Sequence, residues 1–226
     1  MNIVTEVKPK FKKAIKEILA ENKFNAQLDE AALPAYTHGN ALIDYIFWDR
    51  IKTAVSFLLT EKTGEGIEVL DFGCGTGVLS YILANNKYKI TSCDIESIPL
   101  QLMQKKITFP ANIEFIHKDI FETDLIDKKF DAIIALDVLE HISDLEKYVL
   151  AFKKMLKPEG IIIVSGPTEN ILYKIGRKLA GDRFTGNYHV SNISIIKNKF
   201  SKHLKTKTIK RIIWPFVLFE IFAARN

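Results

Sequence analysis

Short apolar blocks alternate with amphipathic blocks from about residue 64 onward. Helical periodicity covers Val78–Asn86, Ile98–Ile107 and Leu145–Leu156. The blocks around them are rich in Ile and Val and bounded by turn-forming residues, which predicts buried strands. These strands are Ile67–Phe72, Lys89–Cys93, Ile113–His117, Phe130–Leu136 and Gly160–Ser165. The alternation predicts an α/β fold built from right-handed βαβ units, with a mostly parallel sheet and helices on both faces.

The end of the chain follows a different pattern. Thr206–Trp214 and Val217–Ala223 have the composition of strands and flank a tight turn at Trp214-Pro215. No helix fits between them, so we expect an antiparallel hairpin. Together with the five upstream strands, the hairpin makes a predicted seven-stranded sheet.

In the first 63 residues the sequence predicts helices and no strand. Ala41–Thr60 has apolar positions on one broad face and predicts an amphipathic helix. Residues 11–21 predict a second, shorter helix, and residues 22–40 are expected to be irregular because Pro34 and Gly39 interrupt them. We expect residues 1–63 to form a helical segment that packs on the sheet or caps its site, and residues 64–226 to form the main domain.

Composition narrows the class of protein. Hydrophobic residues make up 47% of the chain and charged residues 26%, which is typical of a folded domain with a large core. We expect no transmembrane helix and no signal peptide, since no apolar run is long enough for the first and the basic N-terminus lacks the apolar block of the second. Cys74 and Cys93 are too few for a disulfide framework and favour a cytoplasmic location.

The net charge of +5 is unevenly distributed. Residues 197–211 contain seven Lys or Arg residues and no acidic residue. This run is compatible with a solvated face. It is equally compatible with attraction to an anionic partner, such as a lipid surface or a phosphorylated substrate.

A glycine-rich loop is predicted between the first strand and the first helix that follows it. The stretch V-L-D-F-G-C-G-T-G-V-L-S contains Gly73, Gly75 and Gly77. Such a loop lets a ligand touch the backbone near a helix N-terminus, at the edge of the sheet where ligands of α/β proteins bind. A dinucleotide site requires G-x-G-x-x-G, and Val78 stands where its third glycine belongs. A nicotinamide cofactor is therefore disfavoured.

Three acidic residues lie at the predicted ends of neighbouring strands. Asp71 precedes the glycines, where an acid suits a cationic amino group better than a pyrophosphate. Asp94 ends the second strand, at a spacing suited to a ribose diol. Asp119 follows the third strand, where a carboxylate can accept the amino group of adenine. The spacing of Asp94 suits the ribose of either cofactor class. Asp71 and Asp119, with the D-V-L-E-H and K-P-E-G stretches that follow, favour S-adenosylmethionine.

Four motifs resemble those of class I S-adenosylmethionine-dependent methyltransferases of the small-molecule type, which include ubiquinone-pathway enzymes. They are V-L-D-F-G-C-G-T-G, S-C-D-I-E, F-D-A-I-I-A-L-D-V-L-E-H-I and L-K-P-E-G-I-I-I-V-S. The resemblance covers about residues 64–226 and implies a Rossmann-like fold, S-adenosylmethionine as methyl donor and S-adenosylhomocysteine as product. The cofactor-contacting residues that it implies are Asp71, Gly73, Cys74, Gly75, Gly77, Asp94, Ile95, Asp119, Ile120 and Asp137.

The D-V-L-E-H stretch supplies the catalytic candidates. His141 and the later His189 are the best general bases, because imidazole titrates near neutral pH, and Asp137 would line the site near the transferred methyl group. One helical turn after the fourth strand would place Asp137 and His141 on the same side. Related families bind a divalent metal through an acid-x-x-Glu-His arrangement and a later His. Here the first acid is the shorter Asp, so a metal held by Asp137, Glu140, His141 and His189 is the less favoured alternative.

The acceptor is expected to bind near residues 167–192, where this superfamily commonly carries an insertion. A predicted helix there has an apolar face formed by Ile171, Leu172, Ile175 and Leu179 and a basic face opposite. Packing on the core is the favoured reading of that helix, and a membrane-touching lid is the other. We predict methyl transfer to a small-molecule or lipid-like acceptor, preferably at oxygen. RNA 2′-O-methylation and a non-catalytic partner subunit remain alternatives, while no added nucleic-acid-binding module is visible.

Overall fold

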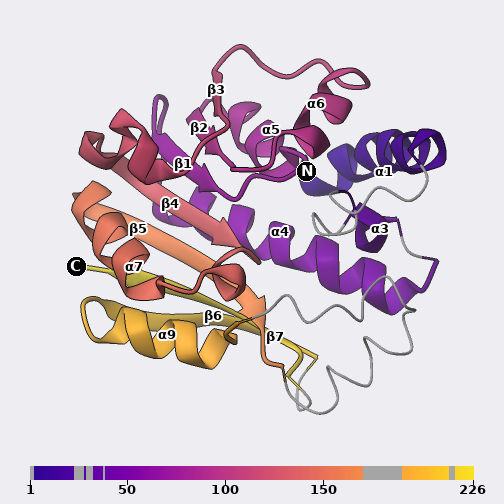
Figure 1. The fold of residues 1–226 in the computed structure, drawn as a ribbon. Helices are drawn as coiled ribbons and strands as arrows, with labels where there is room; N and C mark the ends of the chain where they lie inside the picture. Colours follow the sequence, from indigo (N-terminus) through magenta and orange to yellow (C-terminus); the bar gives the residue numbers. More distant parts are fainter. Residues whose placement is uncertain (1–2, 23–27, 29–32, 38, 170–189, 214–216) are drawn as a thin grey trace.

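The computed structural model describes residues 3–22, 28, 33–37, 39–169, 190–213 and 217–226. Their strands form one seven-stranded sheet in the order β3-β2-β1-β4-β5-β7-β6 (Figure 1). The strands are β1 (Glu68–Phe72), β2 (Lys89–Cys93), β3 (Ile113–Ile116), β4 (Phe130–Leu136), β5 (Leu156–Pro167), β6 (Lys205–Ile212) and β7 (Phe219–Arg225). The predicted seven-stranded α/β fold is confirmed.

The hairpin prediction is also confirmed. Strands β1 to β5 pair in parallel, whereas β7 lies antiparallel between β5 and β6. The predicted turn at Trp214-Pro215 lies outside the described residues. β5 begins at Leu156 rather than at Gly160, because Leu156 already pairs with Phe130 before the register shifts and resumes at Ala132 and Ile161.

The helices agree with the sequence analysis between residues 41 and 155 and differ from it upstream of residue 41 and at α9. The α-helices are α1 (Ile3–Glu21), α3 (Leu33–Tyr36), α4 (Ala41–Glu61), α5 (Val78–Ala84), α6 (Ile98–Gln104), α7 (Leu145–Met155) and α9 (Ile193–Ser201). The prediction of a short helix at 11–21 was wrong in extent, because α1 begins at Ile3 and runs through Pro9. Within the stretch expected to be irregular, α3 forms a single turn.

Helix α9 was not predicted at all. Its buried side chains Ile193, Ile196 and Phe200 have helical spacing, but they are interspersed with the lysines of the basic run. Three 3₁₀ turns complete the described secondary structure: η1 (Ile120–Glu122), η2 (Asp124–Asp127) and η3 (Leu139–His141). Turn η3 follows β4 directly and carries the D-V-L-E-H stretch.

Two hydrophobic cores lie on opposite faces of the sheet. Ala132 and Ile134 of β4 pack in one core with α1, α4 and α5, and Ile133 and Ala135 pack in the other with α7 and α9. Successive side chains of a strand point to opposite faces, so a strand covered on both sides is apolar throughout. Figure 1 shows α7 and α9 in front of the sheet and α4 behind it. The N-terminal helices are therefore part of the main core.

None of the helices in the described ranges is long and apolar enough to span a membrane.

Candidate functional site

The glycine loop joins β1 to α5 and contacts the segment after β4. Gly73 has φ of +74°, and a Cβ placed there would lie 2.5 Å from Cγ2 of Val138. Gly75 also has a positive φ, but no atom lies within 4 Å of the position its Cβ would occupy. The side of Gly75 that lacks a side chain therefore faces open space, where a ligand can approach the backbone. Gly77 is the N-cap of α5.

Asp94 fastens this loop to the end of β2. Its Oδ2 accepts a hydrogen bond from Gly75 N at 2.8 Å, and its Oδ1 accepts one from Glu96 N at 2.9 Å. Burial raises the pKa of Asp94, while these two N–H donors act in the opposite direction. The neighbouring Ile95 is 77% exposed, the highest exposure among the large hydrophobic residues that lie on the described surface.

Asp71 lies behind the loop and is only 3% exposed. Its carboxylate accepts a hydrogen bond from Ser80 Oγ, and the hydroxyl oxygens of Ser80 and Ser92 are 2.7 Å apart. Burial raises the pKa of Asp71 to about 7, the Ser80 hydrogen bond opposes this effect, and the charge of Asp94 adds to it. A cation placed beside Asp71 would relieve this penalty.

The two cysteines lie in the glycine loop and at the end of β2. Both are buried thiols without a disulfide. Burial raises the pKa of Cys74 well above its usual value and that of Cys93 to about 12. Thiols with raised pKa values are poor nucleophiles, so Cys74 can contribute to the loop only through packing and its backbone.

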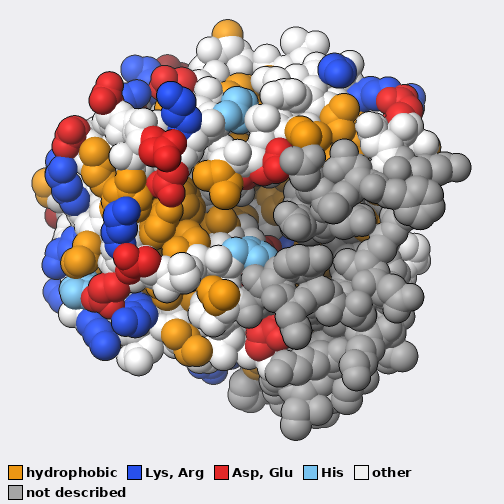
Figure 2. Space-filling view, viewed as in Figure 1, with side chains coloured by type: hydrophobic (Ala, Val, Ile, Leu, Met, Phe, Trp, Pro, Cys, Tyr) orange, Lys and Arg blue, Asp and Glu red, His pale blue; other side chains and the backbone are white. Residues whose placement is uncertain are grey.

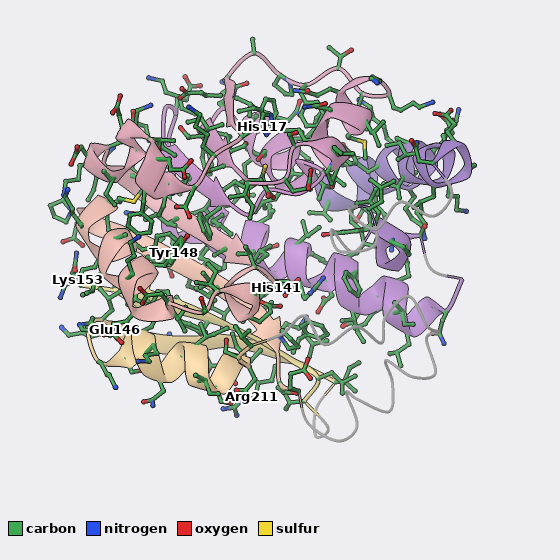
Figure 3. The ribbon with its side chains drawn as sticks, viewed as in Figure 1. His117, His141, Glu146, Tyr148, Lys153 and Arg211 are labelled. Carbon is green, nitrogen blue, oxygen red and sulfur yellow. The ribbon has the colours of Figure 1, made fainter. Side chains whose placement is uncertain are left out.

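Asp119 follows β3 and is held by two donors. Its Oδ1 accepts a hydrogen bond from Phe121 N at 3.0 Å, and the Tyr148 hydroxyl donates to its Oδ2 at 2.5 Å. Tyr148 comes from α7, and Figure 3 shows it in front of the sheet. The side chain of Ile120 is fully buried in the core beneath α7, which leaves its backbone as the part that a ligand can reach.

Asp137 forms an ion pair with a buried arginine, which the sequence analysis missed. It adopts a φ of +55° directly after β4. Ser165 Oγ donates to its Oδ1 at 2.8 Å, and Arg50 Nη1 pairs with its Oδ2. Arg50 is 2% exposed, and its guanidinium lies 4.0 Å from the ring centroid of Phe47 and 4.6 Å from that of Phe219. One signal was available: Arg50 falls on the apolar face of the predicted helix.

The expected helical turn from Asp137 to His141 is wrong. Asp137 lies in the left-handed region, and η3 is a 3₁₀ turn that begins only at Leu139. Glu140 is 1% exposed, and burial raises its pKa to about 7. His141 is exposed instead. Figure 3 places His141 near the carboxyl end of β4 and His117 apart from it, and Figure 2 shows histidine side chains at the surface of this face.

These positions do not fit a metal centre built from the described residues. Asp137 is neutralised by Arg50, Glu140 is enclosed in the core, and His141 is on the surface. Within the described ranges, no three His, Cys, Asp or Glu side chains are grouped closely enough to hold a metal ion. The fourth candidate, His189, lies outside the described residues, as do His38 and the predicted helix at 171–179.

The N-terminal helices border the site. Tyr36 of α3 packs edge-on against Phe47 and Trp48, with ring centroids 5.6 and 5.7 Å apart. Burial raises the pKa of Tyr36; the charge of Arg50 lowers it and that of Asp71 raises it. Because the charges of Arg50 and Asp71 both affect the Tyr36 hydroxyl, this hydroxyl lies near the carboxyl ends of β1 and β4. Tyr36 of α3 and Arg50 of α4 therefore contribute to the same electrostatic environment as Asp71 behind the glycine loop.

The basic run is largely paired with carboxylates. Four of its seven basic side chains form ion pairs: Lys197 and Arg211 with Glu220, Lys199 with Glu146, and Lys210 with Asp49. Lys202, Lys205 and Lys207 make no ion pair within the described part of the chain. Most of the run therefore stabilises the contacts of α9 and β6 rather than forming a separate cationic surface.

Comparisons with known proteins agree with this geometry. A family described as "Methyltransferase domain" matches residues 63–209. The ubiquinone biosynthesis O-methyltransferase of Pasteurella multocida is 32% identical over 124 residues, which cover 49% of this chain and 51% of that protein. That of Rickettsia conorii is 31% identical over 104 residues, or 44% of this chain and 34% of that protein. The chain thus spans about half or less of the length of these relatives.

Solved structures extend the likeness over nearly the whole chain. The magnesium protoporphyrin IX methyltransferase of Synechocystis PCC 6803, crystallised with S-adenosylhomocysteine, has a TM-score of 0.64 and 21% identity, covering 93% of this chain and 100% of that one. The plantazolicin methyltransferase BpumL, also with S-adenosylhomocysteine, has a TM-score of 0.68 and 13% identity, covering 99% and 97%. At these identities the likeness establishes the Rossmann-like fold.

Proposed function

The chain belongs to the methyltransferase-domain family, and on this premise we propose that it transfers a methyl group from S-adenosylmethionine to a small-molecule or lipid-like acceptor, at an oxygen atom. The observation that carries the proposal is the joint between the glycine loop and Asp94, where Gly75 faces open space while its N–H is held by the carboxylate. This joint presents a backbone surface and an acid at one edge of the sheet, as an adenosine-containing ligand requires.

The acids around the loop match the groups of S-adenosylmethionine. We assign Asp94 to accepting hydrogen bonds from the ribose hydroxyls and Asp119 to accepting one from the adenine amino group, with Ile95 covering the ring. Asp71 is suited to the methionine ammonium group, because a buried carboxylate with a raised pKa gains most from a neighbouring cation. The bound cofactor supplies an electrophilic methyl group on a sulfonium centre.

The acceptor side is bordered by Asp137 and His141. An acceptor hydroxyl must lose its proton when its oxygen forms the new bond to carbon. His141 is exposed at the carboxyl end of β4 and is the general base that we assign among the described residues. Asp137 is tied to Arg50 and Ser165, so we assign it to shaping the wall of the site. His189 stays a predicted second base.

An oxygen acceptor is supported by two curated relatives that are named O-methyltransferases. The acceptor-binding segment that we propose at about 167–192 returns to the core at η3, where Val190 N and Ser191 N donate to the Glu140 carbonyl at 2.8 and 3.2 Å. A cytoplasmic location and peripheral membrane contact through the unpaired lysines of the basic run stay predictions.

Calorimetric titration of the full chain with S-adenosylhomocysteine tests the cofactor assignment, with NADH as the control and with magnesium or manganese added in a parallel series. We expect micromolar binding of S-adenosylhomocysteine and none of NADH. Binding of NADH alone would overturn the assignment. A radiolabelled-methyl assay on apolar phenols and on matched amines then tests the acceptor atom, and transfer only to amines would contradict the oxygen proposal.

A further inference from the structure

Three side chains form a hydrogen-bonded chain directly behind the glycine loop. The hydroxyls of Ser92 on β2 and Ser80 on α5 are 2.7 Å apart, and Ser80 Oγ donates to Asp71 on β1. Both serines are 0% exposed. Three polar groups from three consecutive elements of secondary structure are thus removed from water at one point.

Packing alone does not account for two hydroxyls at this point. A buried hydroxyl costs free energy unless it is hydrogen-bonded, and Ala at either position would fill nearly the same volume without that cost. The remaining residues of α5 that point inward are apolar, namely Val78, Leu79, Ile82, Leu83 and Ala84. The hydroxyl of Ser80 therefore has a specific partner in Asp71 rather than a general role in the core.

The groups around Asp71 determine how much the hydrogen bond from Ser80 matters for its charge. Among the described residues, the other titratable groups that act on Asp71 or respond to its charge are Asp94 after β2, Cys93 at the end of β2, Cys74 in the loop and Tyr36 in α3. The Asp94 charge and burial both favour the protonated form of Asp71, and the Ser80 hydrogen bond favours the ionised form. Ser80 thus opposes the two effects that would neutralise this acid.

We propose that Ser80, supported by Ser92, is a positioning residue that orients the carboxylate of Asp71 and stabilises its charge for the ammonium group of the cofactor. The inference rests on the proposed function, since it assigns a role toward the same ligand. Ser80 does not touch the ligand and acts through Asp71. Ser92 acts one step further away, by fixing the direction of the Ser80 hydroxyl.

If Ser80 has this role, loss of its hydroxyl should make the affinity for the cofactor depend on pH. Without Ser80 the pKa of Asp71 rises above about 7, so at neutral pH the carboxyl must lose a proton before it can pair with the ammonium group. Affinity then falls by about tenfold for each unit by which the pKa exceeds the pH. At a pH above the new pKa the loss disappears.

Calorimetry on Ser80→Ala with two ligands separates this role from a packing role. S-adenosylhomocysteine carries the ammonium group, and methylthioadenosine shares the adenosine but lacks the amino and carboxylate groups. At about pH 7 we expect Ser80→Ala to lower the affinity for S-adenosylhomocysteine about fivefold to tenfold. At about pH 8.5 the loss of affinity should shrink to about twofold. Methylthioadenosine should bind with unchanged affinity at both pH values. Ser92→Ala should give a smaller loss of the same kind.

Matched variants keep the test decisive. Thr91→Val removes a buried hydroxyl one residue before Ser92, on the opposite face of β2, and should leave both affinities unchanged. If Ser80→Ala does not fold, Ser80→Cys keeps the volume with a weaker donor and should show the same pH-dependent loss. Equal losses for both ligands at every pH, or no loss at all, would overturn the role of Ser80. Failure of the unmodified chain to bind either ligand would overturn the cofactor assignment and this inference with it.

Discussion

Arg50 Nη1 pairs with Asp137 Oδ2, which joins the middle of α4 to the carboxyl end of β4. The guanidinium is enclosed between the rings of Phe47 and Phe219, and Ser165 Oγ holds the other carboxylate oxygen. A helix that precedes the sheet in sequence thereby fixes a residue at the edge where the site lies. The pair explains why Asp137 is better suited to shaping the site than to accepting a proton.

Arg50→Met should destabilise the protein strongly. The change leaves Asp137 without its cationic partner while retaining the apolar contacts with the two rings, and we expect a loss of about 3 kcal/mol in the free energy of unfolding. Urea denaturation followed by circular dichroism measures it. Lys154→Met is the control: it removes an ion pair with Asp127 in which both side chains are exposed, 57% for Lys154 and 75% for Asp127, so we expect a loss of less than about 1 kcal/mol in the free energy of unfolding. Equal losses would contradict the special position of Arg50.

Asp94→Asn should lower the affinity for S-adenosylhomocysteine about tenfold to a hundredfold. Asn keeps the shape of the side chain but removes the charge that strengthens its bonds to Gly75 N and to the ribose hydroxyls. Calorimetric titration gives the affinity, with the exposed Asp124→Asn as control. An Asp94→Asn protein that binds as tightly as the unmodified chain would remove Asp94 from the proposed site.

Asp71 should lower the stability of the ligand-free protein as the pH rises. Its pKa is about 7 in the folded state and about 4 in the unfolded chain, so the folded state binds more protons between these values. This group therefore reduces the free energy of unfolding by up to about 1.4 kcal/mol per pH unit from about pH 4 to pH 7. Asp71→Asn lacks the effect, so its stability relative to the unmodified chain should rise over that range in denaturation curves. A constant difference at all pH values would contradict the prediction, because it would mean that folding leaves the pKa of Asp71 unchanged.

Tyr148→Phe should reduce discrimination at the adenine end. Its hydroxyl donates to Asp119 Oδ2, and without it the carboxylate keeps, among the described residues, the hydrogen bond from Phe121 N. We expect S-adenosylhomocysteine to bind about threefold to tenfold more weakly, while S-inosylhomocysteine, which lacks the adenine amino group, is unaffected. Tyr81→Phe, which removes a hydroxyl bonded to Lys10, is the control. A parallel loss for both ligands would assign Tyr148 to packing of α7.

His141→Ala should reduce turnover far more than cofactor affinity. Loss of a general base typically lowers the rate by about a hundredfold or more, whereas an exposed imidazole that does not touch the cofactor leaves its affinity within about twofold. The two quantities come from a methyl-transfer assay on an accepted phenol and from calorimetry. His203→Ala, which disrupts a contact with Glu146, serves as the control. Full activity of His141→Ala would return the role of base to His189.

The elements and the cofactor loop followed from local patterns in the sequence. Apolar strands such as Phe130–Leu136, the hairpin and the spacing of Gly73, Gly75 and Gly77 depend on residues close together in the chain. Helix α9 and turn η3 were missed for physical reasons. The apolar stripe of α9 is diluted by lysines, and a helical reading of the residues after β4 ignored the left-handed conformation of Asp137.

The sequence by itself thus determined the α/β class, the sheet with its terminal hairpin, the methyltransferase family and the positions of Asp71, Asp94 and Asp119 at the ends of strands. Only the tertiary structure decided what those acids contact. Ser80 with Asp71, Tyr148 with Asp119 and Arg50 with Asp137 join residues from different elements. Periodicity reports which face of an element is buried, whereas the partner of a buried charge depends on which elements pack together and in what register.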